Sequence, residues 1–368
     1  MKEIRIGVIG IGGIAQLHVQ SIQMQQAIYG SSNGKVKWVI SVDVNEEIAK
    51  TSAEKYGFEK YSADWHDALH CNLDLMIIAT PNAFHYEVAK AAIENNINVF
   101  CEKPLSNDVT KAEELAKLAK EHGVVNYVGY VYVTSPLHQY IKEIVESGKL
   151  GKLVRVRGTF DHDGKLDPNA PLVWRMAKKE YMGGALGDTC SHVLSALSLT
   201  LGDVKRVCAV QNTVIKERPI KAGSSEMGKV EADDITDFLV EYENGVIGTL
   251  GCSSLAGGHP IGIDYEIQGL KGSVKVTQDS LRTAHVWLMD DEDKGFHKVI
   301  LGPNDPVSKG RMWGSYDDMM AFEFNKVFSV LTNGEAYTCD FEFGLKMEKI
   351  IDAVQKSADT HQWVEVAD

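Results

Sequence analysis

The sequence predicts an α/β protein with an N-terminal doubly wound parallel sheet (Rossmann-type) and a C-terminal α/β domain with a large, open, mostly antiparallel sheet. The first prediction follows from the alternation of strand-like and helix-like segments up to about residue 126, with strands that are apolar throughout. The second follows from a change to period-two strands joined by short Asn-Gly or Gly-containing turns. Because 368 residues exceed a usual single domain, we expect domains at 1–126 and 127–368.

The first domain begins with the β-branched run IRIGVI at 4–9, and apolar residues at helical spacing follow it up to residue 28. Further strands and helices then alternate. The strands are expected at 35–43, 73–80, 97–103 and 124–130, and the helices at 45–57, 83–96 and 108–123.

The second domain is expected to begin with a helix at 137–148 and a strand at 151–160. Further strands are expected at 205–214, 235–243, 245–254, 263–269, 272–278 and 285–290. The segment 219–234 is expected to be a mobile loop. An open sheet needs cover on its second face, so we expect a homodimer or homotetramer formed through the C-terminal sheet.

Acidic residues outnumber basic ones, with 51 Asp and Glu against 38 Lys and Arg and a formal net charge of −13. A charge of this sign repels nucleic-acid backbones and anionic lipid, so neither is expected as a partner. The N-terminal apolar run is short and broken by glycines, so we expect neither a signal peptide nor a spanning helix there. A cytoplasmic protein is therefore expected.

The six cysteines, at positions 71, 101, 190, 208, 252 and 339, form no Cys-x-x-Cys pair and no cluster with histidine. Neither a metal site nor a disulfide framework is expected from this spacing. We expect reduced thiols, with Cys101 and Cys190 serving as small space-filling side chains.

The segment GVIGIGGIA at 7–15 leaves the first predicted strand and opens the first helix. Gly10, Gly12 and Ala15 match the G-x-G-x-x-A pattern, in which glycines allow a tight turn and close approach of the backbone to a pyrophosphate. Helix N-terminal amides bind phosphates. The candidate cofactor-binding residues here are Gly10, Ile11, Gly12, Gly13 and Ile14. A glycine turn without a ligand is the alternative.

The second predicted strand ends at Asp43. A carboxylate there can bind both ribose hydroxyls of NAD but repels the 2′-phosphate of NADP, and Val44 and Asn45 offer no compensating arginine. The sequence therefore predicts NAD as cofactor. The alternative is that Asp43 is a plain surface turn residue.

Two turns follow the next predicted strands at the same edge of the sheet. Thr80, Pro81 and Asn82 leave the carboxyl end of a central strand, where ligands bind in open α/β sheets. Glu102, Lys103 and Pro104 leave the neighbouring strand, and we expect the lysine to lie where nicotinamide and substrate meet. The proline restrains this turn and allows a cis peptide bond. A merely solvated Lys-Pro turn is the alternative.

Together, GIGGIA, ATPNAFH and CEKPL resemble the Gfo/Idh/MocA oxidoreductase family, and especially its members that oxidise cyclic polyols and pyranosides. The resemblance continues through WRMAKKEYMGGALGDTCSH at 174–192, KERP at 216–219 and EADD at 231–234 to the segment 352–366. It implies that Lys103, Asp188 and His192 line the hydride-transfer site.

The resemblance also implies that Trp174 and Arg175 line the nicotinamide or substrate pocket, and that His85 lies near the nicotinamide. For Trp174 and Arg175, a buried structural Trp with an Arg ion pair is the alternative. For His85, the alternative is capping or packing on its own helix.

The residues themselves agree with these roles. Asp188 and His192 are four positions apart after the flexible segment GGALGD, so on a helix they face the same way. Histidine titrates near neutrality and can take the hydroxyl proton of a secondary alcohol. Lys103 can stabilise a developing alkoxide, while Asp188 orients the hydroxyl or favours the imidazolium. The alternative is an aspartate helix cap beside a structural histidine.

Two positions depart from the family pattern. Many relatives have an Asp three residues after the catalytic histidine, whereas this chain has Ser195, which can hydrogen-bond but carries no charge. Relatives also often have an arginine before the Pro that follows the dinucleotide domain, whereas Tyr130, Tyr132 and Val133 stand in this segment. We therefore expect Tyr130 and Tyr132 to bind substrate in a less basic, more aromatic pocket suited to a neutral sugar ring.

The predicted function is an NAD-dependent oxidoreductase that moves a hydride between the nicotinamide and a ring secondary alcohol or ketone of a neutral sugar, sugar derivative or cyclitol. No metal is expected. One alternative is an NAD-dependent glycosidase that oxidises a ring carbon transiently. Another is a dinucleotide-sensing regulator on the same fold, which could dispense with Lys103, Asp188 and His192.

Overall fold

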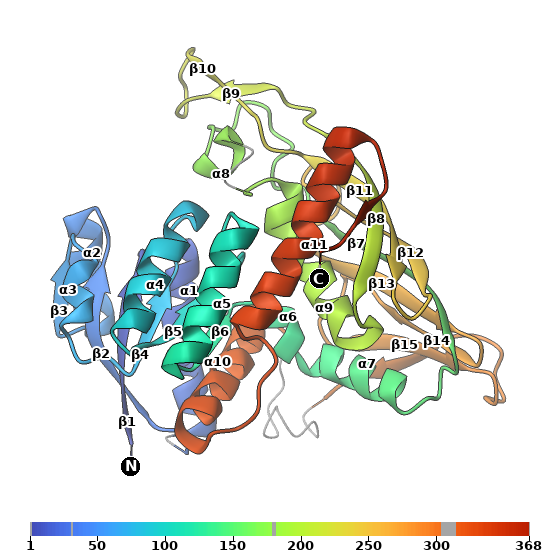
Figure 1. The fold of residues 1–368 in the computed structure, drawn as a ribbon, viewed down its shortest axis with the longest axis horizontal. Coiled ribbons are helices and arrows are strands. Elements are labelled where there is room, and N and C mark those ends of the chain that lie inside the picture. The colour runs from blue at the N-terminus through green and yellow to red at the C-terminus, as the bar shows by residue number, and fades with distance from the viewer. Residues whose placement is uncertain (1, 31, 179–181, 303–313, 368) are drawn as a thin grey trace. The chain divides into compact units, whose positions relative to one another are not determined.

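The computed structural model describes residues 2–30, 32–178, 182–302 and 314–367 (Figure 1). The chain divides into two compact units, Met1–Ser135 with Pro306–Glu348 and Pro136–Asp305 with Lys349–Asp368. The domains at 1–126 and 127–368 stay a prediction. The first unit also includes helix α10 (Tyr316–Asn333), far along the sequence, which packs against α1 (Gly13–Tyr29).

The first unit contains a six-stranded, fully parallel sheet with the order β3-β2-β1-β4-β5-β6. The strand order reverses between β1 and β4, which is where such sheets bind ligands. All four residues of β4 are buried, as its apolar sequence predicts. The strands are β1 (Glu3–Ile9), β2 (Lys35–Val42), β3 (Lys60–Ser62), β4 (Leu75–Ile78), β5 (Asn98–Cys101) and β6 (Asn126–Val128).

The helices of this unit follow the strands as the sequence predicts. Helix α1 is 17 residues long and a turn follows it, which accounts for the long interval between Ala15 and Asp43. The side chain of Asp108 caps α5 by accepting hydrogen bonds from Thr110 N and Lys111 N. The further helices are α2 (Glu46–Tyr56), α3 (His66–Leu69), η1 (Asn82–Phe84), α4 (His85–Glu94), α5 (Val109–His122) and α6 (Val131–Thr134).

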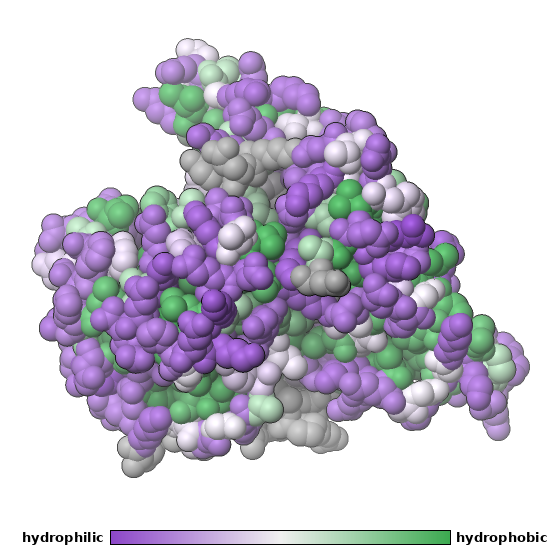
Figure 2. Space-filling view, in the orientation of Figure 1, coloured by the Kyte–Doolittle hydropathy of each residue, from purple (hydrophilic) through white to green (hydrophobic). Residues whose placement is uncertain are grey.

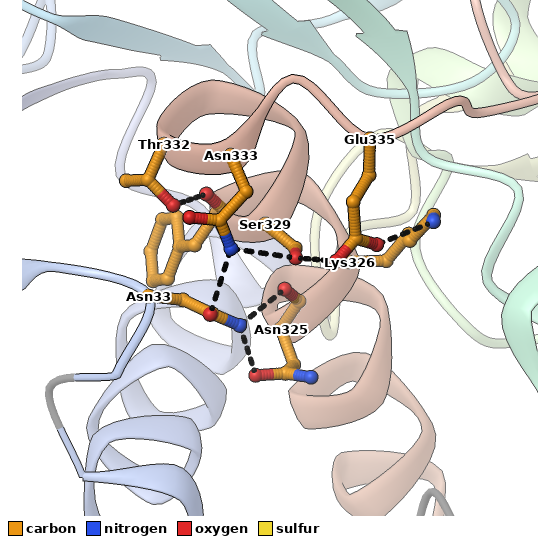
Figure 3. A network of polar contacts seen from close by, with 8 residues as sticks. Asn33, Asn325, Lys326, Ser329, Thr332, Asn333 and Glu335 are labelled. Atoms are coloured by element: carbon orange, nitrogen blue, oxygen red, sulfur yellow. Dashed lines mark hydrogen bonds and ion pairs between the residues drawn. The ribbon is translucent and has the colours of Figure 1, made fainter.

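A polar network joins α10 to the turn after α1 (Figure 3). Asn33 Nδ2 donates to Asn325 Oδ1 at 3.0 Å, and Asn333 Nδ2 lies 3.4 Å from Asn33 Oδ1. Lys326 pairs with Glu335 on the other side of the helix. Residues about 300 positions apart are thus held together by side-chain amides.

The second unit contains a nine-stranded sheet with the order β16-β15-β14-β13-β7-β12-β11-β8-β17. Strands β7 and β12 are parallel and the other neighbours are antiparallel, so the predicted mostly antiparallel sheet is confirmed. Its strands are β7 (Leu153–Asp161), β8 (Val204–Asn212), β11 (Ile235–Tyr242), β12 (Ile247–Ser253), β13 (Gly262–Gly269), β14 (Gly272–Val276), β15 (Thr283–Leu288), β16 (His297–Ile300) and β17 (Val364–Glu365).

Helix α9 (Ser191–Leu201) packs against β7 and β13 and covers part of one face of this sheet. The segment 219–234, which was expected to be a loop, includes half of a small antiparallel hairpin of β9 (Glu217–Pro219) and β10 (Met227–Lys229). The other helices are α7 (Pro136–Glu146), α8 (Trp174–Ala177), the π-helix η3 (Leu186–Cys190) and α11 (Phe341–Thr360), which begins in the first unit and ends in the second.

The surface in Figure 2 is mostly hydrophilic, with smaller apolar patches. Within the described residues, no helix is both long enough and apolar enough to cross a membrane. The six cysteines are free thiols.

Candidate active site

Gly10 forms the turn between β1 and α1 and lies against the turn that follows β4. Its φ of 84° falls in the left-handed region, and a Cβ would lie 2.8 Å from Thr80 N and 2.9 Å from Ala79 O. Both backbone conformation and close approach therefore require glycine here. Thr80 is half-buried, Pro81 exposed and Asn82 buried at this edge of the sheet.

Gly12 and Gly13 leave open space at the start of α1. A Cβ on either residue would meet no heavy atom of the described residues within 4 Å, chain neighbours aside. Gly12 is the N-cap, and no side chain in the described part of the chain caps the helix. This space, beside helix N-terminal amides, fits the pyrophosphate of a dinucleotide.

Asp43 directly follows β2, as predicted, and both of its carboxylate oxygens accept backbone hydrogen bonds. Oδ2 accepts from Ile11 N at 2.9 Å, and Oδ1 accepts from Asn45 N at 2.9 Å. The Ile11 amide, predicted to bind phosphate, is therefore engaged by Asp43 instead. A carboxylate has further lone pairs, which ribose hydroxyls can use.

His85 begins α4 and is fully buried. Its Nδ1 lies 2.8 Å from Pro104 O and its Nε2 lies 2.9 Å from Thr80 O. The ring thus connects the turns that follow β4 and β5. In the turn after β5, the Lys103–Pro104 peptide bond is cis. The predicted proximity of His85 to nicotinamide stays a prediction.

Glu102 and Lys103 follow β5, and no pattern in the sequence indicates the partner of the glutamate. His18 Nε2 on α1 lies 2.6 Å from Glu102 Oε1, and both side chains are buried. Burial alone raises the pKa of Glu102, but the hydrogen bond from His18 and the charges of His18, Lys103 and His85 outweigh it and hold the pKa below its ordinary value. Lys103 itself is half-buried.

In the second unit, Asp188 lies in the π-helix η3 and His192 in the first turn of α9. The predicted regular helix is therefore a π-turn that continues into an α-helix, a feature common at functional sites. Asp188 Oδ1 lies 3.7 Å from Arg175 Nε, and the His192 ring packs at 5.1 Å from the ring of Phe160.

Arg175 contacts both Trp174 and Asp188. Its guanidinium lies 4.5 Å from the ring centroid of Trp174 and also pairs with Asp188. Arg175 can therefore hold the Asp188 carboxylate in a fixed direction while stacking on the indole.

Asp233 anchors the start of η3. It belongs to the segment EADD at 231–234, but nothing in the sequence indicates this role. Its Oδ2 accepts from Leu186 N at 2.8 Å and from Thr236 Oγ1 at 2.7 Å, and its backbone oxygen accepts from Ala185 N at 2.9 Å. A Cβ on Gly184 would lie 1.9 Å from Asp233 Oδ1, so glycine is required there. Burial raises the pKa of Asp233 despite these hydrogen bonds.

Models of known families cover most of the chain. Residues 4–130 match the oxidoreductase family with an NAD-binding Rossmann fold, and residues 138–275 match the Gfo/Idh/MocA C-terminal domain. The chain belongs to the Gfo/Idh/MocA oxidoreductase family. Its first unit therefore carries the NAD-binding domain of this family, and the protein is an NAD-binding oxidoreductase.

Similar proteins span the full length of this Gfo/Idh/MocA member. It is 29% identical to levoglucosan dehydrogenase of Pseudarthrobacter phenanthrenivorans, over 100% of this chain and 99% of that protein. A levoglucosan dehydrogenase structure in complex with NADH and L-sorbose matches with a TM-score of 0.94, 28% identity and full coverage of both chains. A structure of an NAD binding oxidoreductase from Klebsiella pneumoniae matches with a TM-score of 0.92, 30% identity and the same coverage.

Ser195 replaces the acidic residue that many Gfo/Idh/MocA relatives have after the histidine. Its hydroxyl donates to the backbone oxygen of His192 at 2.9 Å. The serine thus bonds to its own helix, so it does not take over the role of a carboxylate on the imidazole in this structure.

Tyr130 and Tyr132, the predicted substrate-binding aromatics of this family member, are buried. The Tyr130 ring packs against Phe343 at 5.7 Å, and Tyr132 packs against Tyr316 at 6.4 Å. Both partners come from the C-terminal part of the first unit, which sequence patterns could not pair with this segment. Stacking on a sugar would require Tyr130 to leave this core, so we assign it no substrate contact.

Proposed function

We propose that this protein is an NAD-dependent dehydrogenase that transfers a hydride between the nicotinamide and a ring secondary alcohol or ketone of a neutral sugar, sugar derivative or cyclitol. One observation carries this proposal. Asp188 lies in η3 and His192 follows in the first turn of α9, in a chain that aligns end to end with levoglucosan dehydrogenase. A dinucleotide-sensing regulator would have no need of this acid and imidazole.

Asp43, Gly12 and Gly13 are the residues that hold the cofactor in this proposal. The glycines give the pyrophosphate room, and the fixed Asp43 carboxylate accepts from the ribose hydroxyls, which favours NAD over NADP. Bound NAD supplies the hydride acceptor. Thr80, Asn82 and the Glu102–Lys103 turn lie at the same edge of the parallel sheet.

The protein's own side chains move the proton. His192 takes the proton of the substrate hydroxyl, while the C–H bond of the same carbon gives up its hydride and the C–O bond becomes a carbonyl. Lys103 donates to the substrate oxygen and stabilises its developing negative charge. Asp188, paired with Arg175, orients the hydroxyl, and Trp174 supports the guanidinium.

Oxidation is measured as NADH absorbance at 340 nm with a panel of pyranoses, anhydrosugars, glycosides, sugar acids and inositols. We expect turnover with a neutral member, and a loss of about 100-fold or more in K103M and in H192N. Lys117 is exposed on α5, so K117M is the matched control and keeps activity. Cleavage of a glycoside without net NADH would support the glycosidase alternative instead.

The proposal includes an oligomer formed through the nine-stranded sheet. Val210, Leu239 and Ile247 are 63%, 48% and 57% exposed and lie on neighbouring strands, on the face away from the buried positions of β8, β11 and β12. Exposed apolar side chains on an open sheet mark an interaction surface. Light scattering should give a dimer or tetramer that L239D/I247D dissociates; a monomeric wild type would contradict this.

We also propose a cytoplasmic location.

A further inference from the structure

His18 is a fully buried histidine in the middle of α1 that the proposed chemistry does not use. Its ring makes edge contacts with Phe100 at 5.1 Å and Phe324 at 5.2 Å. Its Nε2 lies 2.6 Å from Glu102 Oε1, and Nδ1 has no hydrogen-bond partner within the part of the chain that the structure describes. Because an ionised carboxylate only accepts hydrogen bonds, His18 Nε2 donates this one to Glu102.

Glu102 uses its second oxygen on the next residue. Oε2 accepts from Lys103 N at 3.1 Å, so the carboxylate spans from α1 to the backbone of the lysine. A Cβ on Gly129 would lie 3.0 Å from Oε1, and the glycine therefore leaves the carboxylate its space. The carboxylate is fixed by one hydrogen bond at each oxygen.

The charged and titratable groups around Glu102 favour its ionised form. Lys103 and His85 favour its charged form, together with His18. Burial, followed by the charge of Glu102, raises the pKa of Glu323 well above its ordinary value. Burial is also the main reason for the raised pKa of Tyr130 and of Cys101, to which the Glu102 charge contributes. The raised pKa of each of these three neighbours favours its neutral form.

We propose that His18 and Glu102 form a buried positioning pair for Lys103, in which the imidazole fixes the carboxylate and the carboxylate fixes the backbone of the lysine and faces its charge. Neither His18 nor Glu102 contacts substrate in this role. The inference rests on the proposed function, because Lys103 is the lysine that function uses. It makes α1 both a cofactor-binding helix and a support for the catalytic turn.

Three variants separate this role from simple packing. H18L fills the space but removes the donor, and H18Q offers an amide N–H in its place. V19A removes apolar packing from the next residue of α1, which is buried and has no hydrogen-bonding side chain, and serves as the stability control. All three are compared with the wild type in the full-length protein, with and without NAD.

The first readout is the amide proton of Lys103, observed by NMR in protein labelled with ¹⁵N-lysine and assigned with K103R. Because this N–H bonds to Glu102, its shift follows the ionisation of that carboxyl. We expect the transition to move to higher pH in H18L, because burial raises the pKa of Glu102 and the hydrogen bond that lowers it is lost. In H18Q the transition should return towards wild type. A transition unchanged in H18L, or shifted equally in V19A, overturns the pair. This readout needs no substrate.

The second readout is steady-state kinetics with the best sugar or cyclitol found. We expect kcat to fall about 10–100-fold in H18L with KM changed much less, and most of the loss to be restored in H18Q. An H18L enzyme with wild-type kcat overturns the positioning role even if the NMR transition moves. If the wild type oxidises no substrate, the proposed function fails, while the NMR experiment still decides whether the pair fixes Lys103.

Discussion

His85 Nδ1 lies 2.8 Å from the carbonyl oxygen of Pro104, so the first residue of α4 holds the turn that carries Lys103. The other ring nitrogen lies 2.9 Å from Thr80 O in the neighbouring turn. Carbonyl oxygens only accept hydrogen bonds, so two such bonds require a hydrogen on each ring nitrogen. His85 is thus a buried link between two turns at the cofactor edge.

The link predicts a measurable effect on cofactor binding. In H85L both carbonyl contacts are lost, and we expect the Kd of NADH to rise about tenfold, in line with the loss of a charge-assisted hydrogen bond. ¹⁵N NMR of the wild type should show both His85 nitrogens protonated at pH 7. The control is H122A, at the exposed end of α5. A neutral His85 together with unchanged affinity in H85L would refute the link.

Asp43 predicts the choice between the two dinucleotides. D43S removes the negative charge that repels a 2′-phosphate. It also removes the carboxylate oxygens that accept hydrogen bonds from the ribose of NAD. We therefore expect the ratio of kcat/KM for NAD to that for NADP to fall about 10–100-fold. The exposed Glu46, at the start of α2, gives the control E46Q, whose ratio should stay that of the wild type. A D43S enzyme that keeps its preference would mean that specificity lies elsewhere.

Asp233 predicts a coupled loss of stability and turnover. D233A leaves the Leu186 amide and the Thr236 hydroxyl without their acceptor, which should cost about 1–3 kcal/mol in the free energy of unfolding. Because η3 carries Asp188, we also expect kcat to fall about tenfold. Urea unfolding and initial rates measure both effects. E243A, at an exposed position directly after β11, is the control, and equal losses there would contradict the assignment.

Glu323 predicts a pH-dependent cost in stability. Burial and the charge of Glu102 raise its pKa in the folded protein, and neither carboxyl oxygen has a hydrogen-bond partner among the described residues. The unfolded chain therefore loses this proton first, and folding stability falls as pH rises above the ordinary carboxyl pKa.

Replacement of Glu323 by glutamine removes this dependence. We expect the difference in Tm between E323Q and wild type to increase by about 3 °C in favour of the variant between pH 4.5 and pH 8. The exposed Glu342 supplies the control E342Q, which should show a constant difference. A difference independent of pH in E323Q would show that Glu323 is not forced to ionise inside the core.

The parallel sheet and its cofactor edge were predictable because their signals are local. Gly10 needs its conformation, Asp43 directly follows β2, and the apolar strands β4 and β5 are consecutive along the chain and adjacent in the sheet. The antiparallel strands of the second unit were predictable for the same reason. Each of these features depends on a few consecutive residues.

Other features depend on contacts that no local pattern records. Helix α10 reaches Asn33 from about 300 residues away, and the burial of Tyr130 depends on Phe343. His18 looks like any other residue of an amphipathic helix until Glu102 is found beside it. The π-helix that carries Asp188 is held at its start by Asp233, which lies in the loop just before β11, 47 residues after Leu186.

The most direct test of the account follows the hydride itself. Levoglucosan and myo-inositol, deuterated at their ring carbons, are incubated with NAD and wild-type, K103M or H192N protein, and the reduced cofactor is analysed by mass spectrometry. The account predicts NADH one mass unit heavier with at least one of these substrates for the wild type, and at least a 100-fold slower transfer in both variants. Transfer at wild-type rate in the variants, or none from these or any other neutral sugar or cyclitol in the wild type, would contradict it.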